Sequence, residues 1–144
     1  MFPSHDQEFY LKVKASIADV SGTDAFMVGF RKAEAYQADP DSYDEMASLL
    51  VNAGNIFGAQ ILNNAATDED DTTDNWADGE THTLEVYVSA AGVVTYKIDG
   101  ADPTTAPASF TFDAAEVVVP FVYLRHDADV AGAVEIVSFD CGLQ

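Results

Sequence analysis

The chain has 144 residues and carries 25 acidic against 6 basic side chains, for a formal charge of -19. This length predicts one domain over residues 1–144, and 48% hydrophobic residues exclude a disordered chain. The charge excludes nucleic acid and anionic membrane surfaces as partners, because too few basic groups are present to neutralise phosphates. No apolar run approaches the roughly 20 residues that span a bilayer, and no leader peptide is expected.

Alternating apolar and polar residues dominate the first third of the chain and predict strands. The first two strands are expected over Glu8 to Ala15 and over Ala25 to Arg31. Gly29 interrupts the second strand, which predicts a bulge or the close approach of another backbone. Residues 32–45 show no alternation, and Pro40 excludes a continuous helix, so a long loop is expected there.

Two hairpins are predicted in the middle of the chain. Met46 to Val51 and Asn55 to Leu62 are apolar runs separated by a short turn containing glycine. Thr81 to Ser89 and Val93 to Ile98 alternate clearly on either side of a second turn. His82 falls on the inner face of the second hairpin, where we expect a hydrogen-bonded core residue.

The last third of the chain predicts three more strands, over Ser109 to Phe112, Val117 to Arg125 and Ala133 to Asp140. Pro120 lacks a backbone donor, so the middle one of these is expected at a sheet edge or at a bulge. A turn is expected over residues 126–129. About nine strands and no helical period predict an all-β chain folded as an antiparallel β-sandwich.

An acidic stretch runs from Thr67 to Glu80 and holds seven acids and no base. Such a run predicts either a solvated loop or an ion site. Carboxylate oxygens within a short span suit calcium, and the candidate ligands are Asp68, Asp70, Asp71 and Asp74. The span lacks the order of an EF-hand, so a solvated loop without an ion is favoured over a calcium site.

The hairpin around residues 76–100 resembles a known family. Trp76 to Ser89 and Gly92 to Gly100 are similar to the pattern W-x-D-G-x-x-H-x-L-x-V followed by G-x-V-x-Y-x-I-D-G of concanavalin A-like lectin/glucanase domains, including the laminin-G-like group. The resemblance implies a jelly roll. Gly29 to Tyr36 and Val134 to Gln144 resemble structural proteins of marine tailed phages. This second resemblance implies a virion structural protein, such as a capsid decoration protein or an appendage subunit.

Domains of the lectin/glucanase family usually begin with an extra strand near the C-terminal strand. Here the first alternating run begins near residue 8, so Met1 to His5 would cover that edge poorly. An open edge exposes unpaired backbone groups, which proteins normally cover. We therefore expect a neighbouring chain, either a second copy in a homo-oligomer or a capsid protein, to add a strand there.

Catalytic signatures are missing from the sequence, which predicts a protein without enzymatic activity. Glucanase relatives carry E-x-D-x-x-E on one strand, whereas Glu85 and Glu135 stand alone on theirs. No G-x-S-x-G motif accompanies the three histidines. The single cysteine, Cys141, excludes an internal disulfide and a zinc site built from thiolates, and it is expected to be a buried apolar residue.

Two alternatives to a virion protein remain open. The first is a glycan-binding, lectin-like module for attachment to a host or a surface, with exposed aromatic rings as stacking platforms. The candidate rings are Tyr36, Tyr43 and Trp76, although core packing is favoured for Trp76. The second is an assembling surface protein of a halophile, because an acidic surface suits high salt. The location is accordingly the virion or the extracellular space.

Overall fold

The computed structural model describes residues 2–3, 7–126 and 133–144. These residues form ten strands and one turn of 3-10 helix. In chain order they are β1 (Phe2–Pro3), β2 (Phe9–Ile17), β3 (Thr23–Lys32), η1 (Pro40–Ser42), β4 (Met46–Asn52), β5 (Asn55–Ile61), β6 (Asp68–Asn75), β7 (Thr81–Val88), β8 (Val94–Ile98), β9 (Val117–His126) and β10 (Val134–Leu143). None of the helical structure in these ranges is long and apolar enough to cross a bilayer.

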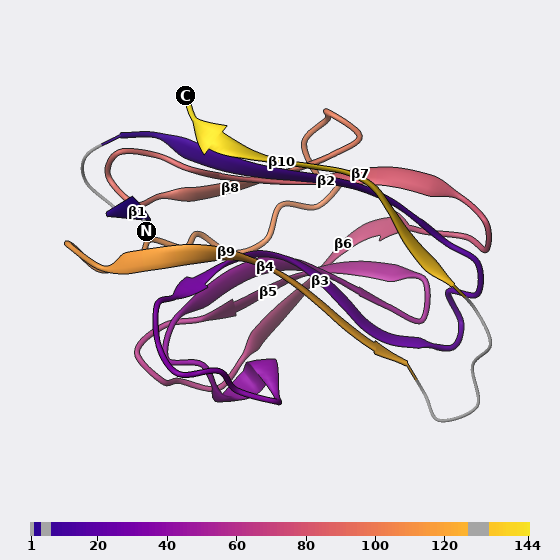
Figure 1. The fold of residues 1–144 in the computed structure, drawn as a ribbon, viewed down its shortest axis with the longest axis horizontal. Helices are drawn as coiled ribbons and strands as arrows, with labels where there is room; N and C mark the ends of the chain where they lie inside the picture. Colours follow the sequence, from indigo (N-terminus) through magenta and orange to yellow (C-terminus); the bar gives the residue numbers. More distant parts are fainter. Residues whose placement is uncertain (1, 4–6, 127–132) are drawn as a thin grey trace.

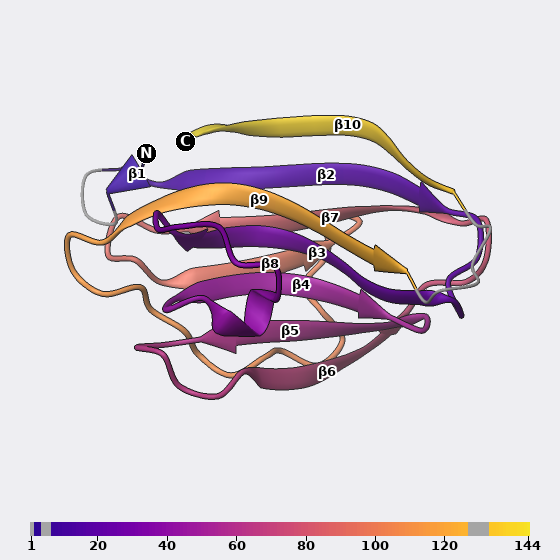
Figure 2. The same cartoon turned by 60° about the horizontal axis from the view of Figure 1, so that its bottom comes forward.

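The strands form two stacked antiparallel sheets (Figure 1). A six-stranded sheet has the order β1-β9-β3-β4-β5-β6, and a four-stranded sheet has the order β10-β2-β7-β8. Figure 2 shows the six-stranded sheet in front, with β9 along its upper side and β6 along its lower side. The predicted all-β antiparallel sandwich is confirmed.

The core lies between the sheets and is built from the alternate residues that the sequence pattern places inward. β2 contributes Phe9, Leu11 and Val13, each at most 1% exposed. β3 contributes Phe26, Val28 and Phe30, and the Phe9 and Phe30 rings meet edge to face at 5.0 Å between centroids. Because the side chains of a strand alternate between faces, one face of every such strand is committed to this interior.

Both predicted hairpins are present. β4 and β5 pair from Met46 with Ile61 to Asn52 with Asn55, and the turn between them uses Ala53 and Gly54, both with positive φ. β7 and β8 pair from Leu84 with Ile98 to Val88 with Val94. The register places the inward residues of each hairpin directly opposite one another.

The glycine of β3 is required by the approach of the neighbouring strand. A Cβ atom added at Gly29 would lie 2.2 Å from the carbonyl oxygen of Ala47 in β4. The prediction of a close backbone approach is confirmed, because no side chain fits at that distance.

His82 is held at the rim of the sandwich, as a hydrogen-bonded residue of the inner face. Its Nδ1 lies 2.6 Å from Asp99 Oδ2 and its Nε2 lies 2.8 Å from Glu80 Oε2. Its ring meets the Trp76 ring edge to face at 4.8 Å between centroids. Both carboxylates raise the pKa of His82 against the opposing effect of burial.

Two predictions of local structure are wrong. The acidic stretch is not a loop, since residues 68–75 form β6 and pair with β5. Residues 109–112 are not a strand, although Thr111 makes an isolated bridge with Val93. The far edge of β6 binds residues 104–108, which belong to the segment 101–112 (hereafter the closing segment).

The closing segment links the free edges of β6 and β8. The backbone N–H of Thr105 donates to Thr72 O of β6 at 2.8 Å, and the N–H of Val94 in β8 donates to Phe110 O at 3.0 Å. Phe112 is 1% exposed and belongs to the core cluster. One side of the interior is thereby sealed by a stretch with little regular structure.

The opposite side of the interior ends at β9 and β10. β1 pairs with β9 only at Val117 and Val118, and not with the C-terminal strand β10. Within the described residues, the edge of β9 that faces β1 has no strand partner beyond Val118, and the edge of β10 away from β2 has none at all. Pro120 thus lies where the pattern predicted, in a strand with an open edge.

Two of the predicted segments lie partly outside the described residues. They are the expected N-terminal strand, at Met1 and residues 4–5, and the predicted turn, at residues 127–129.

Truncation of the closing segment tests its role in the core. Phe112→Ala removes a fully buried ring, so the free energy of unfolding should fall by about 3 kcal/mol. Val93→Ala is the matched control, because Val93 is 42% exposed on the same side of the molecule. Urea unfolding followed by tryptophan fluorescence measures both. A loss below about 1 kcal/mol for Phe112→Ala would contradict this account.

Candidate functional site

A shallow groove crosses the outer face of the six-stranded sheet, on the side away from the core. Its floor is apolar and comes from the outward residues of three adjacent strands. These are Met27 of β3, Leu50 of β4 and Ala59 of β5, all at most 5% exposed. The alternation that buries Phe26 and Val28 on one face therefore delivers a second apolar surface on the other face.

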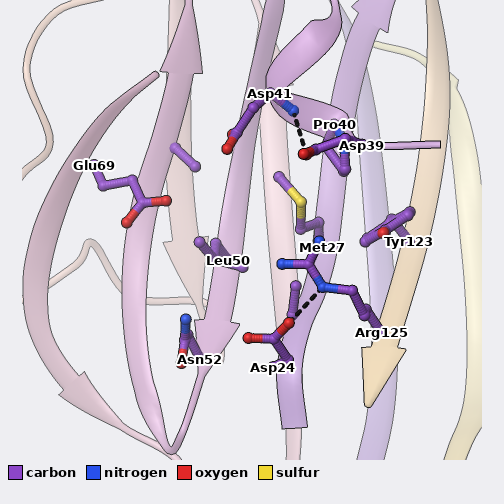
Figure 3. Close-up of a pocket in the computed structure, with 12 residues that line it drawn as sticks. Asp24, Met27, Asp39, Pro40, Asp41, Leu50, Asn52, Glu69, Tyr123 and Arg125 are labelled. Atoms are coloured by element: carbon purple, nitrogen blue, oxygen red, sulfur yellow. Dashed lines mark hydrogen bonds and ion pairs between the residues drawn. The ribbon is translucent and has the colours of Figure 1, made fainter. Parts of the chain in front are cut away.

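Polar side chains surround this floor (Figure 3). Arg125 of β9 forms an ion pair with Asp24 of β3 at one end. Asn52 closes the same end, and Glu69 of β6 lies on the far side of the floor. The hollow between them measures about 60 Å³.

The loop of residues 33–45 covers the other end of the groove. The Tyr123 hydroxyl of β9 donates to Ala38 O at 3.2 Å, which holds the loop against the sheet. Asp39 accepts from the backbone N–H of Asp41 at 3.1 Å, and Asp41 accepts from the Thr67 hydroxyl at 2.7 Å. The loop thus presents two carboxylates, on Asp39 and Asp41, beside the aromatic ring of Tyr123.

A second hollow of about 220 Å³ adjoins the first and shares Pro40 and Tyr123 with it. Arg31, Tyr36 and Phe121 line it as well. The two hollows are neighbours on the outer face of the sheet, and together they are called the groove below.

Both arginines of the chain, Arg31 and Arg125, lie on the groove. Four carboxylates line the first hollow, on Asp24, Asp39, Asp41 and Glu69. The loss of hydration at the Glu69 carboxyl and the nearby charge of Asp41 both raise the pKa of Glu69. The groove consequently has an excess of negative charge around an apolar floor.

The structure separates the three aromatic candidates. Tyr36 is 73% exposed and lines the second hollow, where its ring is available to a ligand. Tyr43 also reaches that hollow but is only 4% exposed, because the Arg31 guanidinium lies 4.4 Å from its ring centroid. Trp76 is 2% exposed and packs edge to face on Phe26 in the core. Tyr36 is thus the candidate whose ring is open to a ligand, Tyr43 lines the hollow with little exposed surface, and Trp76 packs in the core as favoured from the sequence.

The four aspartates predicted as calcium ligands do not converge. Asp70 accepts from the N–H of Ala108 at 2.7 Å, and Asp74 accepts from the N–H of Thr104 at 2.9 Å. Asp71 accepts from the N–H of its neighbour Thr73. In the part of the chain that the structure describes, no three acidic, histidine or cysteine side chains could hold a metal ion. The structure therefore does not gather Asp68, Asp70, Asp71 and Asp74 as calcium ligands, since Asp70 and Asp74 bind the closing segment instead.

Cys141 is half-buried rather than fully buried, and it packs against the core cluster from β10. Burial and the neighbouring Asp140 raise the pKa of its thiol.

Sequence reasoning missed Asn52, Glu69, Tyr123 and Arg125 as groove residues. Asn52 and Glu69 lie on the outer faces of β4 and β6. The pattern of apolar residues in the sequence identifies inward residues and does not single out these two. The available signal was the outward alternation of Tyr123 and Arg125 in a strand that is otherwise apolar. Their neighbours across the sheet, which make the groove, are far away in the chain.

No protein-family model matches the chain, and a search of curated proteins finds no relative. Similarity appears at the level of structure. An alginate lyase from Pseudomonas aeruginosa superposes with a TM-score of 0.67 at 13% identity, covering 99% of this chain and 68% of the lyase. The carbohydrate-binding module CBM66 from Bacillus subtilis superposes at 0.56 and 11% identity, covering 94% and 75%. Sheep galectin-11 superposes at 0.55 and 10% identity, covering 94% and 90%.

These likenesses show the fold, a jelly-roll β-sandwich like that of concanavalin A-like proteins. Two of the first three similar structures are longer by more than half, and the chain spans only 59% and 64% of them. The activity of those longer proteins does not follow from the shared fold.

A buried acid lies where the groove loop rejoins the sheet. Glu45 is 1% exposed and accepts at 3.4 Å from the N–H of Asp113. Burial, followed by a hydrogen bond to the Asp113 carboxyl, raises the pKa of Glu45 to about 7. Lys32 begins the same loop and pairs with Asp44 at 2.8 Å. Both ends of the loop are thus held by titratable groups.

The raised pKa of Glu45 predicts a pH-dependent stability. The folded state holds the Glu45 proton more tightly than the unfolded state does, so stability is greatest below about pH 4.5 and is lost as pH rises through about 7. Glu45→Gln removes this loss. The variant should gain on the order of 1 kcal/mol over the wild type between pH 5 and pH 8.

Urea unfolding at a series of pH values measures this difference. Glu135→Gln, at an exposed position of β10, is the control and should keep the wild-type pH profile. Parallel profiles for Glu45→Gln and the wild type would show that Glu45 ionises normally.

Proposed function

We propose that this chain is a glycan-binding module and that the groove is its binding site. The observation that carries the proposal is one surface with an exposed aromatic ring, Tyr36, and convergent polar side chains around an apolar floor. Sugar rings offer apolar C–H faces to aromatic rings and hydroxyl groups to polar side chains. Asn52, Arg125 and Asp41 can bind such hydroxyls as donor or acceptor.

The charge of the groove favours a neutral glycan over an acidic one. Asp24 is already paired with Arg125, which leaves Asp39, Asp41 and Glu69 to repel an anionic chain such as a polyuronate. Ionised carboxylates are good acceptors for sugar hydroxyls. The same groups that bind a neutral glycan therefore discriminate against a uronate.

The comparisons agree with binding at the level of fold. A carbohydrate-binding module and a galectin share the sandwich, and so do the alginate lyases. The names of those proteins refer to carbohydrates, and for this chain that relation serves only as support for the proposal. The similar structures named above offer no support for a capsid, tail or other virion role, and that role stays a prediction from sequence resemblance. The surface protein of a halophile stays a prediction from the acidic composition.

Substitution of groove residues tests the proposal. A glycan array should first identify a neutral ligand, and calorimetric titration of that ligand should then give its Kd. Tyr36→Ala and Asn52→Ala should each raise the Kd at least tenfold, about 1.4 kcal/mol of binding energy. Tyr87→Ala is the matched control, because Tyr87 lies on the outer face of the four-stranded sheet beside Tyr10.

An unchanged Kd in Tyr36→Ala and Asn52→Ala would place the ligand elsewhere. Uronate ligands that bind better than neutral ones would overturn the charge argument. Each variant should melt within a few degrees of the wild type, since Tyr36 is exposed and Asn52 sits at the end of β4.

We also propose binding without cleavage, and Glu69 supplies the test. A carboxyl with a raised pKa beside a second carboxyl, here Asp41, is the arrangement that acid–base catalysis uses. The bound glycan incubated with the protein should nevertheless release no reducing ends. Release that is lost in Glu69→Gln, with the Kd unchanged, would show that the groove is a hydrolase site instead.

A further inference from the structure

The side of the sandwich opposite the closing segment exposes apolar residues that belong to its interior. Val122 and Leu124 of β9 pair with Val28 and Phe26, which are buried in the core. Directly opposite residues in an antiparallel pair share a face, so both side chains point into the space between the sheets. They are nevertheless 37% and 43% exposed.

β10 repeats this arrangement on the other sheet. Its inward residues pair with the core residues Ala15, Val13 and Phe9 of β2. These inward residues are 43%, 52% and 54% exposed, and they are Ile136, Phe139 and Leu143. The five exposed inward side chains of β9 and β10 are called the seam below.

The seam lies along an edge where both sheets are unpaired. β10 offers a free edge over its ten residues, and β9 offers one beyond its two-residue pairing with β1. Figure 2 shows β9 and β10 along the same upper side of the sandwich. Free backbone groups and apolar side chains together are what an added strand covers.

We infer that a second copy of this chain covers the seam, with the two sandwiches joined edge to edge. A single added strand could continue only one of the two sheets. A second copy presents two sheet edges at the same spacing, and a two-fold axis normal to the sheets brings each edge antiparallel to its own counterpart. Both sheets are then continued at once, and each seam covers the other.

The distribution of charge favours a copy at this side. The four strands nearest the seam, β2, β3, β9 and β10, carry five basic and only three acidic residues, although the whole chain has a formal charge of -19. The bases are Lys12, Lys14, Arg31, Lys32 and Arg125. The acidic excess therefore lies on the rest of the chain. In a dimer joined at the seam, the strongly acidic surfaces of the two copies lie far from each other.

The exposed area of the seam is also comparable to the area that a protein–protein interface buries. The five side chains of the seam expose several hundred Å², and the main chain of two strand edges adds to that; a standard interface buries about 800 Å² on each partner. An apolar patch of this size is at the upper limit for the surface of a monomer.

Sedimentation velocity at protein concentrations from micromolar to near-millimolar tests the inference. The wild type should form a dimer with twice the chain mass of 15.4 kDa, more stable at high salt because the remaining repulsion is screened. Phe139→Glu on β10 and Leu124→Lys on β9 should each weaken dimerisation at least tenfold. These substitutions fall on two different strands, so misfolding of one variant leaves the other informative.

Val93→Glu is the matched control, since Val93 is also exposed, at 42%, but lies beside β8 away from the seam. It should leave the dimer intact. A wild type that stays monomeric at every concentration and salt overturns the inference. So does an oligomer that survives both Phe139→Glu and Leu124→Lys in folded protein, as judged by circular dichroism and melting temperature.

Discussion

The fold depends on how the space between the two sheets is closed. A two-sheet sandwich buries its inner faces but leaves two open sides. On one side β6 binds the closing segment through its own aspartates, which accept backbone N–H groups of Thr104 and Ala108. Phe112 then fills the interior behind them. A hydrogen bond to a charged acceptor is stronger than one between neutral groups, so a highly acidic strand is well suited to hold an irregular segment.

The other side and the outer face follow from the same arrangement. β9 and β10 end the sheets with no comparable segment among the described residues, so their inward apolar residues are exposed. The six-stranded sheet meanwhile has a second apolar surface outside, covered in part by the loop of residues 33–45. That loop is anchored by Tyr123 at its middle and by Lys32 and Asp44 at its ends. β9 therefore takes part in both surfaces, with Tyr123 and Arg125 in the groove and Val122 and Leu124 in the seam.

The candidate site was only partly predictable from sequence. Tyr36 is exposed in a long loop, and a polar loop with aromatic residues is a local property that the sequence displays. Trp76 and Tyr43 sit in similar stretches, yet burial against Phe26 and beneath Arg31 removes them from solvent. The run of aspartates in β6 looked like an ion site because composition does not reveal which donors will face each carboxylate. Those donors lie 30 and 38 residues later in the chain.

The sequence by itself determined the class of the fold, both hairpins and the inward face of the clearly alternating strands, β2, β3 and β7. These are decided by alternation and by turn residues, which act over a few neighbouring positions. Only the tertiary structure decided where β9 lies, and with it the groove. Asp24 and Arg125 are 101 residues apart in sequence but form an ion pair across β3 and β9. Strand order sets such pairings, and local pattern carries no information about which strands become neighbours.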